Sequence, residues 1–272
     1  MKICMFTNTY LPHVGGVARS VSFFAEDLCK AGHRVLVIAP TYPGNETHGH
    51  YDPDTLRLPA IQKFNGSDFS LRIPVPFLVD EKLDDFDPDI IHSHHPYLLG
   101  DAALRVARRR QLPLIFTHHT LYEEYTHYIV DNPENMKRFA AFLSTNYAGM
   151  CDRVIAPSQS IKDLIRERGV TAPISIVPTG VDTAFFANGD GVAFRKSHGI
   201  STGAMVIGHL GRLAPEKNLA YLARAVAHAM ERLPEAHFLV VGEGPSQKEI
   251  AHIFDQAGLH DRLVLAGEIT GH

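Results

Sequence analysis

The sequence predicts an α/β protein of two domains, each built around a parallel sheet. Short apolar runs typical of buried strands alternate with segments whose apolar residues recur at helical spacing. A glycine loop follows the first strand of each half, and the alternation breaks around residues 178–182 before it restarts at Met205. Because 272 residues suit two domains of ordinary size, we expect domains over residues 1–178 and 179–272.

The first half opens with a βαβ unit. Residues 2–7 predict a buried strand, apolar residues from Val17 to Leu28 recur at helical spacing, and residues 34–39 predict the second strand. The loop between them contains Gly15-Gly16, a place where nucleotides or phosphorylated ligands usually bind. The motif GxGxxG is absent and no acidic residue closes the second strand, so the dinucleotide fingerprint is missing.

The remaining elements follow the same alternation after an irregular stretch. Residues 42–88 are rich in Pro, Gly and Asp, and we expect irregular structure there except for a β-like piece at 55–58. Beyond them we expect strands at 90–92, 114–116, 153–155, 174–177, 205–210, 237–241 and 263–266, and helices at 98–110, 134–149, 159–168 and from Leu219. In the common doubly wound order the strand at 205–210 would lie at an open edge.

The bulk composition restricts the class of protein. A formal charge of -4 and a pI near 6.5 disfavour a general nucleic-acid binder. Cys4, Cys29 and Cys151 are widely spaced, which indicates reduced thiols and neither a disulfide framework nor zinc spacing. We see no targeting segment and no run of transmembrane length. These features predict a cytoplasmic protein.

Residues 208–219 predict an anion site at a strand-to-helix turn. Gly211 allows close approach to a ligand, Arg212 lies in the loop, and Lys217 is expected at the start of the helix. Free N–H groups and the helix dipole favour an anion there, and two cations suggest a diphosphate. The alternative is a capped surface turn with solvated charges.

Histidines follow two neighbouring strands of the first half. His92, His94 and His95 follow one strand and His118 and His119 the next, at the sheet edge where α/β proteins bind ligands. We expect no metal, because no Cys or carboxylate is spaced to complete a coordination shell. Hydrogen bonding or proton sharing in a cleft is one reading, and satisfaction of strand-end backbone groups is the other. His118 is favoured because a polar, aromatic loop containing Tyr122 and Glu123 follows it.

Two further segments leave alternatives open. Gly242-Glu243-Gly244-Pro245 is either a simple turn or part of a nucleotide cleft. The helix at 98–110 carries arginines opposite an apolar face, and it is either a solvated helix or one that rests on anionic lipid. The arginines are Arg105, Arg108, Arg109 and Arg110.

Several motifs together resemble glycosyltransferase family 4, the retaining nucleotide-sugar enzymes of GT-B fold. They are Gly15-Gly16, Pro157-Ser158, Val177 to Asp182, Gly208 to Asn218 and Val241 to Pro245, in the family's order and across nearly the whole chain. His92 to Pro96 together with Thr117 to Tyr125 is similar to the branch that glycosylates diacylglycerol.

The resemblance implies a cleft between two Rossmann-like domains, with the acceptor mainly on the first and a UDP- or GDP-sugar such as UDP-glucose mainly on the second. It implies hexose transfer with retention to a lipid or sugar acceptor, no cofactor or metal, and a peripheral membrane contact at the inner face. Its implied catalytic residues are His118, Arg212 and Lys217, its donor-binding residues Gly16, Arg212, Lys217, Gly242, Gly244 and Ile269, and its acceptor-binding residues Gly15, Tyr122 and Glu123.

The sequence departs from the family at its end. The family continues with a paired-glutamate motif and a return of the chain to the first domain, and neither follows before His272. We therefore expect an incomplete second domain, either as the N-terminal portion of a longer enzyme or as a shortened one. A GT-B-fold nucleotide-sugar epimerase and a non-catalytic nucleotide-binding module are the alternatives.

Overall fold

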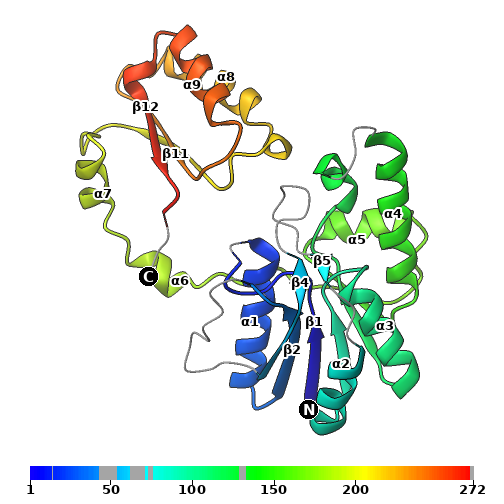
Figure 1. Ribbon diagram of the computed structural model, residues 1–272. Helices are drawn as coiled ribbons and strands as arrows, with labels where there is room; N and C mark the ends of the chain where they lie inside the picture. The colour runs from blue at the N-terminus through cyan, green and yellow to red at the C-terminus, as the bar shows by residue number, and fades with distance from the viewer. Residues whose placement is uncertain (14, 43–53, 62–70, 73–75, 129–132, 270–272) are drawn as a thin grey trace. The chain divides into compact units, whose positions relative to one another are not determined.

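The computed structural model describes residues 1–13, 15–42, 54–61, 71–72, 76–128 and 133–269 (Figure 1). The chain divides into two compact units, Met1–Val181 and Asp182–His272. The division falls close to the predicted boundary after residue 178. Each unit is described separately below.

The described residues of the first unit form a seven-stranded parallel sheet in the order β3-β2-β1-β6-β7-β8-β9. This confirms the predicted α/β class with parallel strands. The strands are β1 Lys2–Phe6, β2 Arg34–Pro40, β3 Asp54–Leu58, β6 Ile90–Ser93, β7 Leu114–Thr117, β8 Arg153–Ala156 and β9 Ile174–Ile176. A small antiparallel pair, β4 Ala60–Ile61 and β5 Leu71–Arg72, accompanies the sheet.

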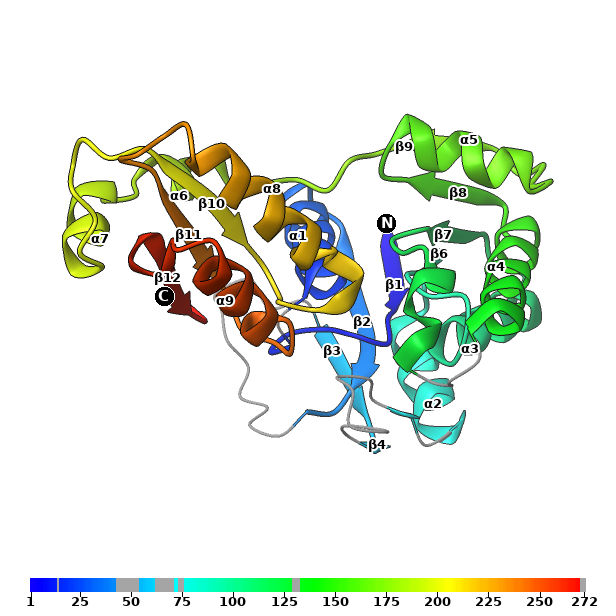
Figure 2. The same cartoon turned by 90° about the horizontal axis from the view of Figure 1, so that it is seen from above.

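Strand alternation sends neighbouring residues of β1 to opposite faces of this sheet. Ile3 and Met5 pack under α1 (Gly16–Lys30), and Cys4 and Phe6 pack under the helices of the other face. Figures 1 and 2 show α1 on one side of β1 and β2, with α2 and α3 on the other. The helices after α1 are α2 Pro76–Phe86, α3 Leu99–Arg110, α4 Pro133–Gly149 and α5 Gln159–Glu167, with a 3-10 helix, η2, at Tyr122–Tyr128.

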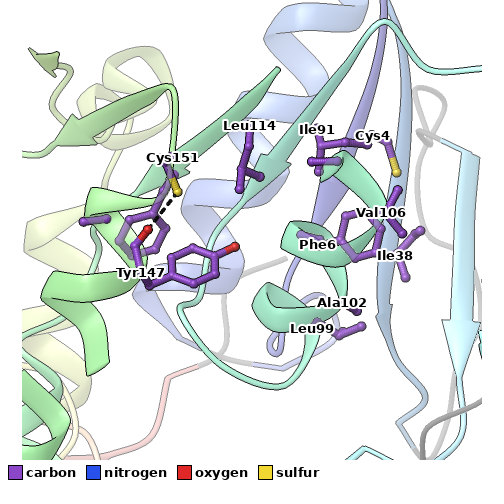
Figure 3. Packing of buried hydrophobic residues seen from close by; sticks show 14 of the residues in the cluster. Cys4, Phe6, Ile38, Ile91, Leu99, Ala102, Val106, Leu114, Tyr147 and Cys151 are labelled. Atoms are coloured by element: carbon purple, nitrogen blue, oxygen red, sulfur yellow. Dashed lines mark hydrogen bonds between the residues drawn. The ribbon is translucent and has the colours of Figure 1, made fainter. Parts of the chain in front are cut away.

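Figure 3 shows how the larger core closes around β1 and α3. Phe6 lies beside Ile38 and Ile91 of the neighbouring strands, and α3 covers them with apolar side chains one and two turns apart. At the end of α4, Cys151 Sγ donates to Tyr147 O at 3.2 Å. All three cysteines are free thiols, and Cys4 and Cys151 are buried, so this core is held by packing alone.

The expectation of irregular structure over residues 42–88 is wrong for α2. Val79, Leu83 and Phe86 are buried and recur at helical spacing, so the signal was present among the prolines and acidic residues. The β-like piece at 55–58 belongs to β3, which pairs in parallel with β2 at the edge of the sheet. The rest of that stretch falls partly on 43–53, 62–70 and 73–75, outside the described residues.

The second unit has a three-stranded parallel sheet in the order β10-β11-β12. In the described part of the chain, β10 pairs only with β11, which confirms the predicted open edge. Its strands are β10 Val206–Leu210, β11 His237–Val241 and β12 Leu263–Gly267, and its helices are α6 Thr183–Ala187, α7 Gly191–Ser197, α8 Leu219–Met230 and α9 Gln247–Gln256. Single 3-10 turns stand at Pro215–Lys217 (η3) and His260–Arg262 (η4).

Side chains of α8 and α9 form the core of this unit with Phe238 and Val240 of β11. Phe238 stacks on Phe254 of α9 with ring centroids 5.3 Å apart. The loop after β10 contributes Leu213, which is fully buried. The core therefore anchors the loop that carries Arg212. Nowhere in the described ranges is a helix both long enough and apolar enough to span a bilayer.

Candidate functional site

In the second unit, the loop after β10 is hydrogen-bonded through its backbone to the loop after β11. Gly211 N donates to Val241 O at 2.9 Å, and Leu213 N donates to Glu243 O at 2.8 Å. Ser246 N donates to Leu213 O at 3.0 Å. Residues 211–213 and 241–246 thus form one backbone-paired platform at the carboxyl ends of β10 and β11, where open α/β sheets bind ligands.

Gly242 and Gly244 make this close pairing possible. A Cβ on Gly242 would lie 2.0 Å from Gly211 O, and one on Gly244 would lie 2.3 Å from Leu213 O. Both glycines also have positive φ, at 132° and 152°, which L side chains rarely adopt. Both glycines therefore have a structural role, because they let one loop pack on the backbone that carries Arg212. Direct contact of Gly242 and Gly244 with a donor stays a prediction.

Substitution of Gly244 by alanine is expected to lower the free energy that holds the two loops of this platform together by roughly 1–3 kcal/mol, the typical cost of a strained backbone residue. The Leu213 amide, which donates to Glu243 O, should exchange its hydrogen faster by one to two orders of magnitude. The matched control is Gly258→Ala, because Gly258 also has positive φ but a Cβ there meets nothing among the described residues. Equal exchange of Leu213 in the two variants would show that the close approach does not hold the loop.

Arg212 and Lys217 both lie on the surface of this platform. Arg212 Nη2 donates to Glu216 Oε1 at 2.7 Å, and the Glu216 side chain is only 7% exposed whereas that of Arg212 is 42% exposed. Burial and, second, the positive charge of Lys217 lower the pKa of His209, which places Lys217 near the end of β10. The turn therefore presents two cations, one of them oriented by a nearly buried carboxylate.

The expected position of Lys217 at the start of the helix needs correction. Lys217 ends the 3-10 turn η3, Asn218 follows in the left-handed region with φ 50°, and α8 begins at Leu219. Pro215 fits the first position of such a turn, and the left-handed Asn218 separates it from the helix. No side chain of the described residues caps α8. Its first N–H groups thus remain available to an anion.

The segment after β12 adjoins the same platform. Gly242 N donates to Gly267 O at 2.7 Å, and Ile269 is half exposed two residues further on. The structure thus brings together the predicted donor residues of this unit: Arg212, Lys217, Gly242, Gly244 and Ile269 border one set of backbone-paired loops.

In the first unit, Gly15 and Gly16 stand at the uncapped start of α1. Gly15 is extended, with φ −173°, and no described side chain caps the helix. A Cβ on Gly15 would lie 3.1 Å from the His13 ring, whereas one on Gly16 would meet nothing within 4 Å among the described residues. Packing among the described residues therefore gives no reason for a glycine at position 16.

Four buried histidines, His92, His94, His95 and His118, and the partly buried His119 lie at the carboxyl ends of β6 and β7. Three of these rings lie within hydrogen-bond distance of another side chain: His92 Nε2 is 2.7 Å from Thr117 Oγ1, and His94 Nδ1 is 2.9 Å from His119 Nε2. His95, in contrast, accepts a backbone hydrogen bond from Asn8 N at 3.1 Å. His95 thus satisfies a backbone N–H, as the second reading expects, whereas hydrogen bonding or proton sharing in a cleft stays a prediction. In the residues that can be described, no three His, Cys, Asp or Glu side chains are arranged to hold a metal.

Burial keeps these imidazoles neutral. It lowers the pKa of His92 to about 4 and that of His95 to about 3. Burial, followed by the neighbouring histidines, lowers the pKa of His119 to about 3 and that of His94 well below its usual value. Near pH 7 these rings therefore act as hydrogen-bonding groups and not as cations.

His118 differs from the other four because its ring is unsatisfied. It is 1% exposed, and neither ring nitrogen has a hydrogen-bond partner in the part of the chain that the structure describes. Burial lowers its pKa to about 4, with Glu123 acting in the opposite direction. Leaving a buried polar group unpaired costs about 1–3 kcal/mol.

The loop after His118 places Tyr122 and Glu123 in the interior. The Tyr122 ring lies edge-on to His118 at 6.0 Å, and its hydroxyl has no hydrogen-bond partner among the described residues. Glu123 is buried, and its Oε1 accepts a hydrogen bond from Arg168 Nη2 at 2.5 Å. The structure thus joins His118 to Tyr122 and gives Glu123 a structural partner that ties η2 to the end of α5.

Arg168 was missed by the sequence reasoning. It follows α5 directly as its C-cap residue, where a basic residue is common and carries no functional signal. Nothing in its local sequence indicates that it pairs with a carboxylate 45 positions earlier.

The arginines of α3 are mostly paired within the unit. Arg105 bonds Asp101 on the same helix, and Arg109 and Arg110 bond Asp80 and Asp84 of α2. Arg108 donates to Met150 O at 2.7 Å. The positive charge that suggested α3 as a lipid-binding helix is therefore largely neutralised by the acidic helix that the sequence prediction left out.

Comparison with known proteins identifies the relatives of this chain. The sequence pattern of Glycosyltransferase Family 4 matches residues 14–185, and that of Glycosyl transferases group 1 matches residues 192–272. An alpha-monoglucosyldiacylglycerol synthase of Streptococcus pneumoniae is 27% identical over 99% of this chain and 62% of its own length. A GDP-mannose-dependent alpha-mannosyltransferase of Corynebacterium glutamicum is 30% identical over 94% of the chain and 61% of its own length.

Solved structures show the same fold. The structure of sucrose-phosphate synthase from Thermosynechococcus elongatus aligns with a TM-score of 0.72 at 17% identity. The alignment covers 98% of this chain and 70% of the synthase chain. HepE of Anabaena, solved in complex with UDP and glucose, aligns over 99% and 70% with a TM-score of 0.67 at 19% identity. The fold is that of GT-B glycosyltransferases, as predicted. The chain spans slightly over six-tenths of the length of its two sequence relatives named above. With its first sequence pattern matching more than half of its residues, the chain belongs to glycosyltransferase family 4.

Proposed function

We propose that this chain carries the acceptor side and part of the donor side of an enzyme that transfers a hexose, with retention, from a UDP- or GDP-sugar to a lipid or sugar acceptor. The observation that carries the proposal is the platform of residues 211–213 and 241–246, which, with the turn that follows it, presents Arg212 and Lys217 beside an uncapped helix start. The relatives, one a glucosyldiacylglycerol synthase and one a GDP-mannose-dependent mannosyltransferase, support a nucleotide-sugar donor and a lipid or sugar acceptor.

The chemistry fits a reaction in which a diphosphate leaves. Negative charge grows on the leaving group as its bond to the sugar breaks, and fixed positive charge stabilises the transition state more than the bound substrate. The Arg212 guanidinium can bind two phosphate oxygens at once, and the Lys217 ammonium supplies a point charge. Since these side chains provide the positive charge, we propose that transfer uses no metal and no other cofactor.

Residues of the first unit would hold the sugar and the acceptor. The neutral, unpartnered His118 ring can donate to or accept from a sugar hydroxyl near the reacting carbon. Gly16 would let the donor approach the start of α1, where no Cβ is in the way. We place the acceptor beside Gly15 and the Tyr122 hydroxyl, with Glu123 contributing its second carboxylate oxygen. In the cell, we propose that transfer takes place on the cytoplasmic side of a membrane, with UDP-glucose the first donor to test.

Nucleotide binding provides the first test. UDP or GDP at a hundredfold excess over its Kd should stabilise the chain by about 2.7 kcal/mol, and Arg212→Ala with Lys217→Ala should abolish the rise in Tm. The matched control is Arg224→Ala with Lys196→Ala, which removes two exposed cations of the same unit, on α8 and α7, outside the two loops. Equal shifts in all three proteins would contradict the site assignment.

Product analysis separates the three activities. Release of free nucleotide that depends on acceptor supports transfer, isomerised sugar formed without acceptor supports an epimerase, and binding without turnover supports a nucleotide-binding module. Diacylglycerol and a glycolipid should be compared as acceptors, each with UDP-glucose and GDP-mannose.

A further inference from the structure

The outward face of α4 carries an apolar stripe in the first unit. Phe139, Phe142 and Leu143 are 52%, 63% and 38% exposed and recur at helical spacing, and Met150 just beyond the helix is 44% exposed. The side of the same helix that faces the core is also apolar, because Tyr147 and Ala148 are buried and Tyr147 packs edge-on to Phe116. The helix is therefore apolar on both sides, and one of these sides faces water.

Cationic groups flank the stripe at both ends. Arg138 is exposed beside Phe139, and Lys137 pairs with the exposed Glu134 at 3.8 Å. At the far end, the Arg108 guanidinium lies against the backbone of Met150. Aromatic residues between basic ones are the composition of helices that lie in the plane of an anionic membrane surface.

The size of the stripe argues against a stable protein interface. Four side chains at about half exposure offer on the order of 400 Å² of apolar surface, whereas specific protein interfaces bury about 1,000 Å² or more. Partial insertion into a lipid headgroup region requires no matching surface, and it removes the two phenylalanine rings from water.

We propose that the surface formed by Phe139, Phe142, Leu143 and Met150 binds the surface of an anionic lipid bilayer. The proposal rests on the proposed function in one respect, namely that an enzyme with a lipid acceptor has to work at a membrane. It replaces α3 by α4 as the lipid-facing helix, because three of the four α3 arginines pair with Asp80, Asp84 and Asp101. The fourth, Arg108, lies against Met150 at the end of the α4 stripe.

Co-sedimentation with vesicles tests the proposal on the whole chain. Vesicles of phosphatidylcholine with one third phosphatidylglycerol should retain the wild type, and Phe139→Ser with Phe142→Ser should weaken binding about tenfold or more. Arg138→Gln should weaken it less and reduce its salt dependence. The matched control is Phe185→Ser with Phe186→Ser on α6, which removes two phenylalanines of similar exposure, 60% and 66%.

Each outcome decides the proposal. Loss of binding in the α4 variant alone, with an unchanged urea midpoint, supports it. Equal binding by both variants, or equal loss in both, overturns it. A concentration-dependent dimer without lipid that disappears in the α4 variant also overturns it, because the stripe would then be covered by a second copy. The vesicles contain neither diacylglycerol nor nucleotide sugar, so failure of the proposed transfer reaction leaves this result unaffected.

Discussion

Acidification from about pH 6.5 to about pH 5.5 is expected to lower the unfolding free energy of the Met1–Val181 unit by roughly 1 kcal/mol for each histidine that is buried and neutral. Burial lowers the pKa of five histidines, His92, His94, His95, His118 and His119, in four cases to about 3 or 4. The unfolded chain takes up protons as the pH falls through 6.5, the ordinary histidine value, whereas the folded unit does not.

The sign follows from that difference in bound protons. The stabilising contribution is fully present above the unfolded pKa, is lost as the pH falls, and stops changing only below the folded values near 3 to 4. The urea concentration at which this unit is half unfolded should therefore fall steeply below pH 6.5. Hydrogen exchange of the β6 and β7 amides measures it.

A single substitution tests the origin of this slope. His92→Gln keeps a side-chain amide that can bond Thr117 Oγ1 but cannot titrate. The slope of unfolding free energy against pH should therefore decrease by the equivalent of about one proton. His228→Gln, which removes a histidine of the other unit, should leave the slope measured for the Met1–Val181 unit unchanged. Identical slopes in the two variants would show that the buried histidines are not its source.

Replacement of Arg168 by methionine is expected to destabilise the first unit by about 2–4 kcal/mol, since breaking a buried ion pair leaves an uncompensated charge. The Glu123 side chain is 10% exposed and that of Arg168 25%, so Glu123 would lose its partner in a dry environment. The 3-10 helix η2 carries Tyr122 against the His118 ring, and it should move with Glu123. Chemical denaturation measures the loss, and the His118 ring resonances report the movement.

Two further variants identify the cause. Arg168→Lys should recover part of the stability, because it restores the charge without the planar guanidinium. Arg168→Met with Glu123→Leu should recover most of it, because no buried charge remains. If the double variant is no more stable than Arg168→Met alone, the effect is lost packing of the arginine stem and not the broken ion pair.

The sequence predicts most of this fold because strand and helix periodicity is a local property. Residues 2–7 and 34–39 carry that signal without interference, whereas in α2 it is mixed with prolines and acidic residues and was overlooked. The order of β10, β11 and β12 followed from topology rules that need no side-chain detail.

The candidate site is only partly readable from sequence. Position after a strand was enough to select His118 and Arg212, but not to show that the His118 ring has no partner among the described residues or that Arg212 bonds Glu216. The bond between Glu123 and Arg168 joins residues 45 positions apart, and such a pairing depends on how α5 packs. The separation of Lys217 from α8 depends on one left-handed residue, Asn218, which asparagine tolerates but does not require.

The pairing of the two loops in the second unit has a consequence for engineering. Main-chain hydrogen bonds and two glycines set the path of residues 211–213, so the loop keeps its shape whichever side chains it carries at positions 212 and 243. A library at position 243, where the side chain is exposed, should therefore fold at wild-type yield, whereas replacement of Arg212 also removes the partner of the nearly buried Glu216. Under the proposed function, selection from the library at position 243 sorts variants by the donor that they accept, and this separates the evolution of donor preference from the evolution of foldability.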